Sequence, residues 1–422
     1  MIEDMIELGL ERAQSSIIKV VGVGGAGCNA VNHMYNSGIH GVDFIICNTD
    51  AQAMLNSPVP VKIQLGATLT GGRGAGNQPE QGEQAAIENL DDVRSVLEDT
   101  TKMMFITAGM GGGTGTGAAP VIAALARELG ILTIAVVTVP SPSEGRRRYE
   151  QAKAGVDRLQ QYVDSILVVS NEKLHLIHGN LPASQAFKKA DDIITTAVKG
   201  IAEIITVHGN INIDFADVYT VMANSNVFIM GTGIAEGDDR AMTAVHAALE
   251  SPLLDSNDIN GTKDILLNII SGEDEITMGE IGDIIEFLQN KAGQDANIIW
   301  GNGCDPKLGT KISVTIAATR FDRNPSHLLQ KEAPVSKLSL QADMDPEAGF
   351  DEPIYQGTVF EPVPEPSKSP AAASKTSRPV NRKKKASGEL IENSEAGDTD
   401  NWFKRQFMKL FEEQDDAMTD KN

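Results

Sequence analysis

Short apolar runs alternate with longer helical patterns through the first half of the chain. The runs are rich in β-branched residues, and several are apolar almost throughout, as strands are when both faces of their sheet are covered. Strands are predicted at residues 17–23, 43–47, 61–65, 103–107, 131–138 and 165–170, and helices at 79–97, 118–129 and 146–159. This alternation predicts an α/β fold with a doubly wound parallel sheet.

A long amphipathic pattern follows the last of these strands. From Phe187 to Ile205, apolar residues recur at the 3.6-residue period of a helix. Ser184 is suited to cap the start of this helix, and Gly209 is suited to end it. The sequence therefore predicts a long central helix over residues 184–209 that joins two domains.

The pattern beyond the central helix predicts a second, smaller α/β domain. Its expected strands and helices lie at residues 228–230, 239–249, 264–270, 279–291, 296–300 and 311–318. The expected organisation is an N-terminal extension (1–14), a first domain (15–183), the central helix (184–209), a second domain (210–322), a disordered linker (323–395) and a C-terminal peptide (396–422).

The linker and the C-terminal peptide differ in composition. The linker is rich in Pro, Ser, Ala, Glu and Lys and has no packing periodicity, which predicts disorder. In the peptide, Trp402, Phe403, Phe407 and Phe411 fall close to one helical face. This pattern is typical of a short segment that folds on a partner protein. Acidic residues follow at once, at 412–413 and 415–416, so direct membrane insertion is not expected.

Charge, cysteine usage and hydropathy narrow the class of protein. The formal net charge is -22, which disfavours nucleic acid as a partner. Cys28, Cys47 and Cys304 are widely spaced and odd in number, which favours a reducing compartment over a disulfide framework. No apolar run approaches the ~20 residues of a membrane helix, and the first residues lack an apolar signal core. We expect a cytoplasmic protein.

The first glycine-rich loop follows the strand at 17–23 and leads into a helix. Its residues Gly22-Val-Gly-Gly-Ala-Gly-Cys-Asn29 match the GxGxxG pattern of dinucleotide-binding proteins. Glycines there let backbone N–H groups approach a phosphate at a helix N-terminus. The motif is weak alone, and a tight strand–helix turn remains an alternative.

Two further glycine-rich loops strengthen the phosphate interpretation. Residues 109–117 hold six glycines and two threonines between a strand and a helix, and residues 71–77 hold four glycines after the strand at 61–65. Such loops are entropically costly to fold, and the threonine hydroxyls suit phosphate oxygens or hydrated Mg²⁺. Ligands of parallel sheets bind at the carboxyl ends of the strands, so the three loops point to one ligand with several phosphates. The P-loop pattern GxxxxGK[ST] is absent.

The run Gly111-Gly-Gly-Thr-Gly-Thr-Gly117 resembles the signature of the tubulin/FtsZ family of GTPases. Nearly all of residues 17–320 is similar to the FtsZ branch of this family, and further matching segments lie at 48–52, 74–76, 144–148, 171–173 and 212–217. The resemblance implies a GTP-dependent, polymerising cytoskeletal protein that forms the cytokinetic ring at the bacterial division site. Filaments would lie at the inner face of the membrane, tethered through partner proteins that bind the C-terminal peptide.

The resemblance also implies roles for individual residues. GTP or GDP would contact Gly24, Gly25, Ala26, Gly27, Cys28, Asn29, Gly76, Gly112, Gly113, Thr114, Gly115, Thr116, Gly117, Glu144, Arg148, Asn171, Phe187 and Asp191. Among these, Glu144 would meet the ribose, Phe187 would stack on the base, and Asn171 and Asp191 would bind the guanine edge. From the residues alone, Asp191 and Arg148 are better interpreted as solvated surface charges.

The segment Asn212-Ile-Asp-Phe-Ala-Asp217 carries the implied catalytic role. Asp214 and Asp217 are three residues apart and share one face of a helical turn. The resemblance implies that Asn212, Asp214 and Asp217 complete the active site of the neighbouring subunit in a head-to-tail filament. Mg²⁺ would accompany the nucleotide, and K⁺ could join near the two acids. From the residues alone, Asp214 reads equally as a helix N-cap.

The sequence departs from the family pattern at two places. Ser141, Pro142 and Ser143 stand where the family usually carries phenylalanines, and the usual C-terminal peptide motif is absent.

Two other functions remain as alternatives. A tubulin-like regulator that does not polymerise would lack the paired acids Asp214 and Asp217. An NAD-dependent oxidoreductase would use Asp50 for the ribose, but it leaves residues 111–117 unexplained. His175 and His178 are interpreted as surface residues rather than metal ligands.

Overall fold

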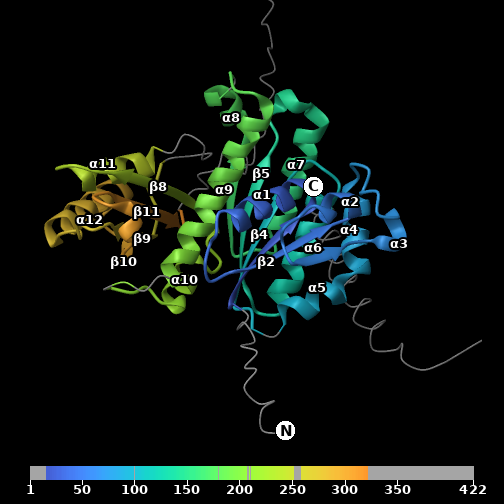
Figure 1. Cartoon of the computed structure of the whole chain (residues 1–422), viewed down its shortest axis with the longest axis horizontal. Helices are drawn as coiled ribbons and strands as arrows, with labels where there is room; N and C mark the ends of the chain where they lie inside the picture. The colour runs from blue at the N-terminus through green and yellow to red at the C-terminus, as the bar shows by residue number, and fades with distance from the viewer. Residues whose placement is uncertain are drawn as a thin grey trace, which may run out of the picture. The chain divides into compact units, whose positions relative to one another are not determined.

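The computed structural model describes residues 16–98, 100–178, 180–206, 209, 211–250 and 258–321. They belong to one compact unit, which spans residues 1–331. The predicted N-terminal extension, the disordered linker and the C-terminal peptide lie outside the described residues. Figure 1 shows two α/β domains, each with its own sheet, on either side of a long helix, α9 (Ala183–Thr206).

The first sheet has seven parallel strands in the order β3-β2-β1-β4-β5-β6-β7. Its strands are β1 (Ile18–Val23), β2 (Asp43–Asn48), β3 (Val61–Gln64), β4 (Met103–Gly109), β5 (Leu132–Val139), β6 (Ser165–Ser170) and β7 (Asn226–Val227). The strand order reverses between β1 and β4, which is where doubly wound sheets bind their ligands. The predicted fold class is confirmed.

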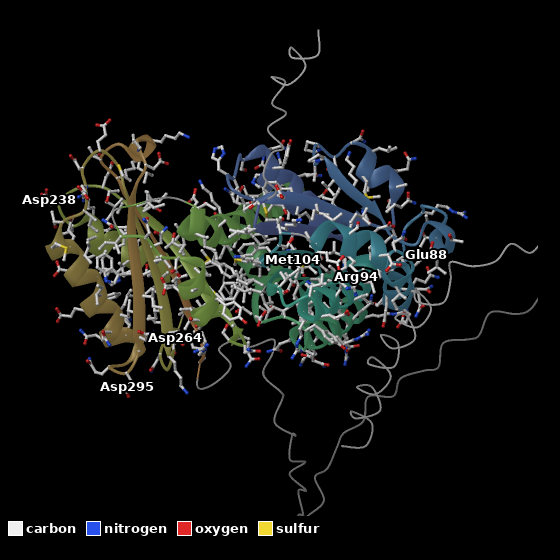
Figure 2. The ribbon with its side chains drawn as sticks, turned by 90° about the horizontal axis from the view of Figure 1, so that it is seen from below. Glu88, Arg94, Met104, Asp238, Asp264 and Asp295 are labelled. Atoms are coloured by element: carbon white, nitrogen blue, oxygen red, sulfur yellow. The ribbon has the colours of Figure 1, made fainter. Side chains whose placement is uncertain are left out.

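Helices surround this sheet and hold most of its apolar residues away from water. They are α1 (Gly24–Asn36), α2 (Ala51–Leu55), α3 (Ala67–Thr70), α4 (Pro79–Glu88), α5 (Leu90–Leu97), α6 (Thr114–Glu128), α7 (Arg146–Gln160) and α8 (Asn171–His178), with a 3₁₀ turn at Pro142–Glu144. Strands β1, β4, β5 and β6 are almost entirely buried. Met104 of β4 lies inside this domain, with Glu88 and Arg94 at its periphery (Figure 2).

Two predicted helices differ from those in the structure. The helix expected at 79–97 is two helices, because the backbone leaves the helical region at Asn89. Helix α6 begins at Thr114, four residues earlier than predicted, so part of the glycine-rich loop forms its first turn. Gly117, in this first turn, lets α4 pack closely against α6, since a Cβ there would lie 1.9 Å from the carbonyl oxygen of Pro79 at the start of α4.

The central helix α9 lies between the two sheets and shares one core with both. Its buried face includes Ile194, Val198 and Ile201, as the predicted stripe requires. The same apolar cluster contains Phe105 of the first sheet and Leu266 of the second. Burying apolar surface stabilises a fold by about 25 cal/mol per Å². The two domains are therefore stabilised together, through α9.

The second sheet has four strands in the order β10-β9-β11-β8, with β11 antiparallel to both neighbours. Its elements are α10 (Phe215–Met222), β8 (Ile229–Ala235), α11 (Arg240–Leu249), β9 (Asp264–Ser271), α12 (Met278–Ala292), β10 (Asn297–Cys304), a 3₁₀ turn (Pro306–Leu308) and β11 (Ile312–Thr319). Helices α11 and α12 cover one face of the sheet with a separate apolar core.

The expected domain boundary at residue 209 does not match the strand pairing. Asn226 and Val227 pair with β6 and complete the first sheet, so the chain returns to the first domain after α9 and α10. Strand β8 also extends beyond the predicted residues 228–230, through glycines that the pattern did not favour. A Cβ at Gly231 would lie 1.8 Å from the carbonyl oxygen of Ala248, so the glycine lets α11 pack against this strand.

Candidate nucleotide site

A cavity of about 590 Å³ opens at the carboxyl ends of β1, β4 and β5, on the side where α1 and α6 begin. This volume falls within the usual range of small-molecule sites. Twelve of the predicted contact residues line it: Gly25, Ala26, Asn29, Gly112, Gly113, Thr114, Gly115, Glu144, Arg148, Asn171, Phe187 and Asp191. The structure thus brings together residues from the first and second glycine loops with side chains from α7, α8 and α9.

Two helix N-termini meet at one side of the cavity. Helix α1 starts at Gly24 and α6 at Thr114, and neither start has a capping side chain or an acidic residue in its first turn. The first N–H groups of a helix lack intrahelical acceptors, and the helix dipole adds partial positive charge there. This side of the cavity is therefore built to bind an anion such as a phosphate.

Close backbone contacts bring these helix starts together. A Cβ at Gly27 would lie 2.3 Å from the carbonyl oxygen of Thr107, and one at Gly115 would lie 2.6 Å from that of Gly109. Gly24 adopts φ +71, a region that glycine favours, with Gly115 N only 2.8 Å from its notional Cβ. These glycines are required by packing, whereas Gly25 has open space around its notional Cβ.

Polar side chains gather at the opposite side of the cavity. Glu144 Oε1 accepts hydrogen bonds from the backbone N–H of Ser141 (3.0 Å) and from Nδ2 of Asn171 (3.1 Å), and Glu144 Oε2 lies 3.8 Å from Arg148. The amide oxygen Oδ1 of Asn171 is buried and has no hydrogen-bond partner. A buried acceptor without a partner costs free energy, so this atom suits a ligand N–H donor.

Asp191 lies on α9 and lines the same cavity as Asn171. Burial raises the pKa of its carboxyl group to about 6, while His33 opposes the shift and Asp192 adds to it. His33 Nε2 lies 2.9 Å from Oδ1 of Asp192, which ties α1 to α9. Phe187, one helical turn before Asp191, is half exposed and lines the cavity. A carboxylate, an amide oxygen and an aromatic ring in this arrangement fit the donor edge and the face of a purine.

Six predicted contact residues do not line the cavity. Gly24, Gly27 and Gly117 serve the packing described above, and Gly76 adopts φ +58 in the third glycine loop. Thr116 uses its hydroxyl to accept a hydrogen bond from the Gly111 N–H at 2.8 Å. The thiol of Cys28 is buried against the carbonyl oxygens of Gly22 and Cys47, and burial raises its pKa to about 12.

The sequence reasoning missed eight residues that line the cavity. They are Thr107, Ala108, Gly109, Met110, Thr138, Pro140, Ala190 and Ile194. Six of them end or closely follow a predicted strand, so the rule that ligands sit at the carboxyl ends of parallel strands would have added them to the predicted contacts. His175, interpreted from sequence as a surface residue, has Nε2 3.9 Å from Glu144 Oε1.

The predicted catalytic acids lie at the other end of α9. Asp214 caps the start of α10 and accepts from the Asp217 N–H at 2.9 Å, while Asp217 Oδ2 accepts from the Asp214 N–H at 3.2 Å. Asn212 Oδ1 accepts from the Gly209 N–H. Asp191 lies fifteen residues before the end of α9, which at 1.5 Å per residue is about 22 Å. Helices α8 and α10 accordingly lie at opposite ends of α9 (Figure 1), so these acids do not reach the cavity of their own chain.

Within the described ranges, no group of three or more His, Cys, Asp or Glu side chains is arranged to hold a metal ion. No helix in this part of the chain is both long and apolar enough to cross a membrane.

The fold and this site together define a nucleotide-binding protein with a tubulin-like GTPase domain. Residues 17–179 match the model of the Tubulin/FtsZ family GTPase domain, and residues 227–322 match that of the FtsZ family C-terminal domain. The cell division protein FtsZ of Porphyromonas gingivalis is 48% identical over 308 residues, covering 72% of this chain and 67% of that protein. FtsZ of Azotobacter vinelandii is 48% identical over 316 residues, covering 75% of this chain and 80% of that protein.

Solved structures agree with these relatives. An empty FtsZ dimer from M. jannaschii superposes with a TM-score of 0.68 at 38% identity, covering 80% of this chain and 99% of that one. CetZ1 from Haloferax volcanii, 18% identical, has a TM-score of 0.63 over 71% of this chain and 93% of its own, and shows the shared fold alone. The chain belongs to the FtsZ family.

Two alanine substitutions separate packing glycines from ligand-facing glycines. Gly27→Ala should lower the free energy of unfolding by about 1–3 kcal/mol, because its Cβ collides with β4. Gly25→Ala should leave that free energy within about 0.5 kcal/mol of wild type, since no atom lies near the new Cβ. It should nevertheless weaken GTP binding by about tenfold or more, equivalent to ~1.4 kcal/mol, because the methyl group enters the cavity.

Chemical denaturation and titration with a fluorescent GTP analogue measure both effects. Equal GTP affinity for Gly25→Ala and wild type would show that phosphates do not contact the start of α1.

Proposed function

We propose that this protein hydrolyses GTP in head-to-tail filaments that form the cytokinetic ring of a dividing bacterium. The observation that carries the proposal is the separation of two half-sites within one chain. A cavity suited to a nucleotide lies at one end of α9, where Asp191 lines it. Asp214, which is exposed, and Asp217, which is partly exposed, lie beyond the other end of this helix, and about 22 Å of helix separates Asp191 from that end.

The arrangement of the cavity supports GTP as the ligand. The phosphates would bind at the starts of α1 and α6, with Gly112 and Gly113 beside them. The buried amide oxygen of Asn171 and the carboxylate of Asp191 would accept from the N–H groups of guanine. Guanine presents N–H donors at N1 and N2, whereas N1 of adenine is an acceptor. A site with two acceptors at this position therefore favours guanine. Glu144 would contact the ribose and Phe187 the base.

Hydrolysis would be completed between subunits. Asp214 and Asp217 would orient and polarise the water that attacks the γ-phosphate held by the next subunit, with Asn212 beside them. Phosphoryl transfer relies largely on such positioning and charge stabilisation. A contact between two different surfaces of the same molecule repeats without closing, so it builds an open filament. Turnover would therefore depend on assembly.

The metal ions would come with the nucleotide. Mg²⁺ usually keeps several waters and binds through phosphates and few protein groups, which fits a cavity with no carboxylate cluster among its described residues. The Thr114 hydroxyl, 2.6 Å from that of Thr49, belongs to the lining of the cavity and would contact the hydrated ion. K⁺ would bind beside Asp214 and Asp217.

Partners other than the chain itself would bind the C-terminal peptide at residues 396–422. Its clustered aromatic residues suit a groove on a tethering or regulatory division protein, which would hold filaments at the inner face of the membrane.

Asp217→Ala tests the shared site. We expect GTP affinity to equal that of wild type, because the side chain is remote from the cavity of its own chain. GTP turnover should fall by about 100-fold or more, the usual contribution of a group that handles the attacking water. Loss of half a capping box should lower stability by about 0.5–2 kcal/mol. Phosphate release and nucleotide binding are measured on the same samples.

Asp283→Ala is the matched control, since it removes an exposed acid from α12 in the second domain. Its turnover should equal that of wild type. If Asp217→Ala abolished GTP binding, or left turnover unchanged, the trans-acting role would be wrong.

The raised pKa of Asp191 predicts pH-dependent binding. Above pH 6 its carboxyl group is charged and accepts from guanine, whereas below pH 6 a proton must first be released. GTP affinity should therefore fall as pH drops from 7 to 5, by up to about tenfold per unit below 6. The phosphates also titrate near pH 6, so Asp191→Asn supplies the control that retains only their contribution. Identical pH slopes for the two proteins would exclude Asp191 from guanine binding.

A further inference from the structure

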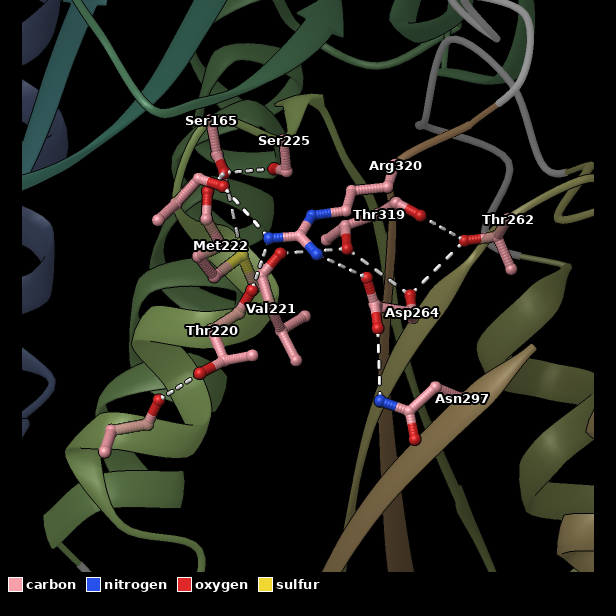
Figure 3. A network of polar contacts seen from close by, with 12 residues as sticks. Ser165, Thr220, Val221, Met222, Ser225, Thr262, Asp264, Asn297, Thr319 and Arg320 are labelled. Atoms are coloured by element: carbon pink, nitrogen blue, oxygen red, sulfur yellow. Dashed lines mark hydrogen bonds and ion pairs between the residues drawn. The ribbon is translucent and has the colours of Figure 1, made fainter. Parts of the chain in front are cut away.

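Helix α10 carries the two acids at its start, and an unusual set of contacts holds its end. The last four carbonyl oxygens of a helix have no intrahelical partner. At the end of α10 the carbonyl oxygens of the last three residues and of the C-cap residue Ala223 each accept from a side chain. Arg320 Nη2 donates to Thr220 O (2.6 Å) and Ala223 O (3.4 Å), Thr319 Oγ1 to Val221 O (3.1 Å), and Ser165 Oγ to Met222 O (2.7 Å). We call Arg320, Thr319 and Ser165 the α10 clamp; Figure 3 shows these contacts.

The clamp connects α10 to both sheets. Ser165 is the first residue of β6 in the first sheet, whereas Thr319 ends β11 in the second and Arg320 follows it. Arg320 Nη1 also donates to Asp264 Oδ2 at 3.1 Å, and Asn297 Nδ2 donates to the other oxygen of the same carboxylate at 3.1 Å. Asp264 starts β9 and is buried. One guanidinium thus joins the end of α10 to the start of β9, and through the Asp264 carboxylate to the start of β10.

Arg320 adopts a backbone conformation that its side chain does not favour. Its φ is 53, in the left-handed region where glycine is the usual residue. A non-glycine residue keeps such a conformation only when its surroundings determine it. The guanidinium contacts supply that determination, and a cation at a helix C-terminus is also favoured by the helix dipole.

From these contacts we infer that Arg320 is a positioning residue for GTP hydrolysis, acting through α10 on Asp214 and Asp217. The inference rests on the proposed function of those acids. Helix α10 has eight residues and is about 12 Å long, so a tilt of about 5° at its clamped end moves its start by about 1 Å. Misplacing catalytic groups by about 1 Å costs on the order of 100-fold in rate.

The test compares four proteins for GTP affinity, thermal stability, amide hydrogen exchange and turnover at saturating GTP per assembled subunit. Arg320→Gly removes the guanidinium and relieves the backbone. Arg320→Lys keeps the charge but cannot bridge Asp264 and two carbonyl oxygens as a planar fork does. Arg94→Ala is the control, because Arg94 pairs with Glu128 at 2.9 Å on the first domain, on α5.

We expect Arg320→Gly to bind GTP as wild type does, with an unchanged KM and a kcat at least about tenfold lower. The kcat of Arg320→Lys should fall between those of Arg320→Gly and wild type. Exchange should accelerate in α10 and not in α9, and Arg94→Ala should keep the wild-type kcat. A purely structural cap would lower the melting temperature and leave kcat per assembled subunit unchanged.

Wild-type kcat for Arg320→Gly would overturn the inference. If Arg320→Gly lost its cooperative thermal transition, Arg320→Lys would decide, and a wild-type kcat for that variant would overturn it equally. Failure of the proposed function is recognised separately, because the Asp217→Ala protein would then turn over GTP as fast as wild type. In that case the inference falls with it, whatever the Arg320 variants show.

Discussion

The starts of α1 and α6 lie so close to strands β1 and β4 that no side chain fits between them. Cβ atoms at Gly27 and Gly115 would lie only 2.3 Å and 2.6 Å from the carbonyl oxygens of Thr107 and Gly109, too close for a side chain. This contact brings two uncapped helix N-termini to one cavity, at the point where the strand order reverses. The glycines therefore build the phosphate side of the site mainly by permitting packing, and only some of them face the ligand.

The rest of the molecule places the surface for which we propose the catalytic role at a fixed distance from this cavity. Helix α9 packs into one apolar cluster with both sheets, so its two ends keep their spacing. Asp191 and Phe187 serve the cavity near its start, and α10 presents Asp214 and Asp217 beyond its end. The α10 clamp fixes the direction of these acids relative to both sheets. We propose that in a filament the cavity of one subunit meets the Asp214 and Asp217 surface of the next.

Much of this could be predicted from residue patterns, for identifiable reasons. Buried parallel strands are apolar throughout, and the stripe of α9 has a clear helical period, so both were found. The glycine loops identified the cavity, although pattern alone does not separate ligand-facing Gly25 from packing glycines such as Gly117. Strand β7 was missed because two residues carry no periodicity. Arg320 gave no signal, since its role depends on carbonyl oxygens of a helix about 100 residues away in sequence.

An active site that requires two subunits makes GTP turnover depend on protein concentration. Phosphate release should be measured with GTP and Mg²⁺ over a range of protein concentrations, beside light scattering of the same samples. We expect turnover that appears only above a threshold concentration, together with scattering. Turnover proportional to protein from the lowest concentration, without scattering, would contradict it and indicate a self-sufficient nucleotide enzyme.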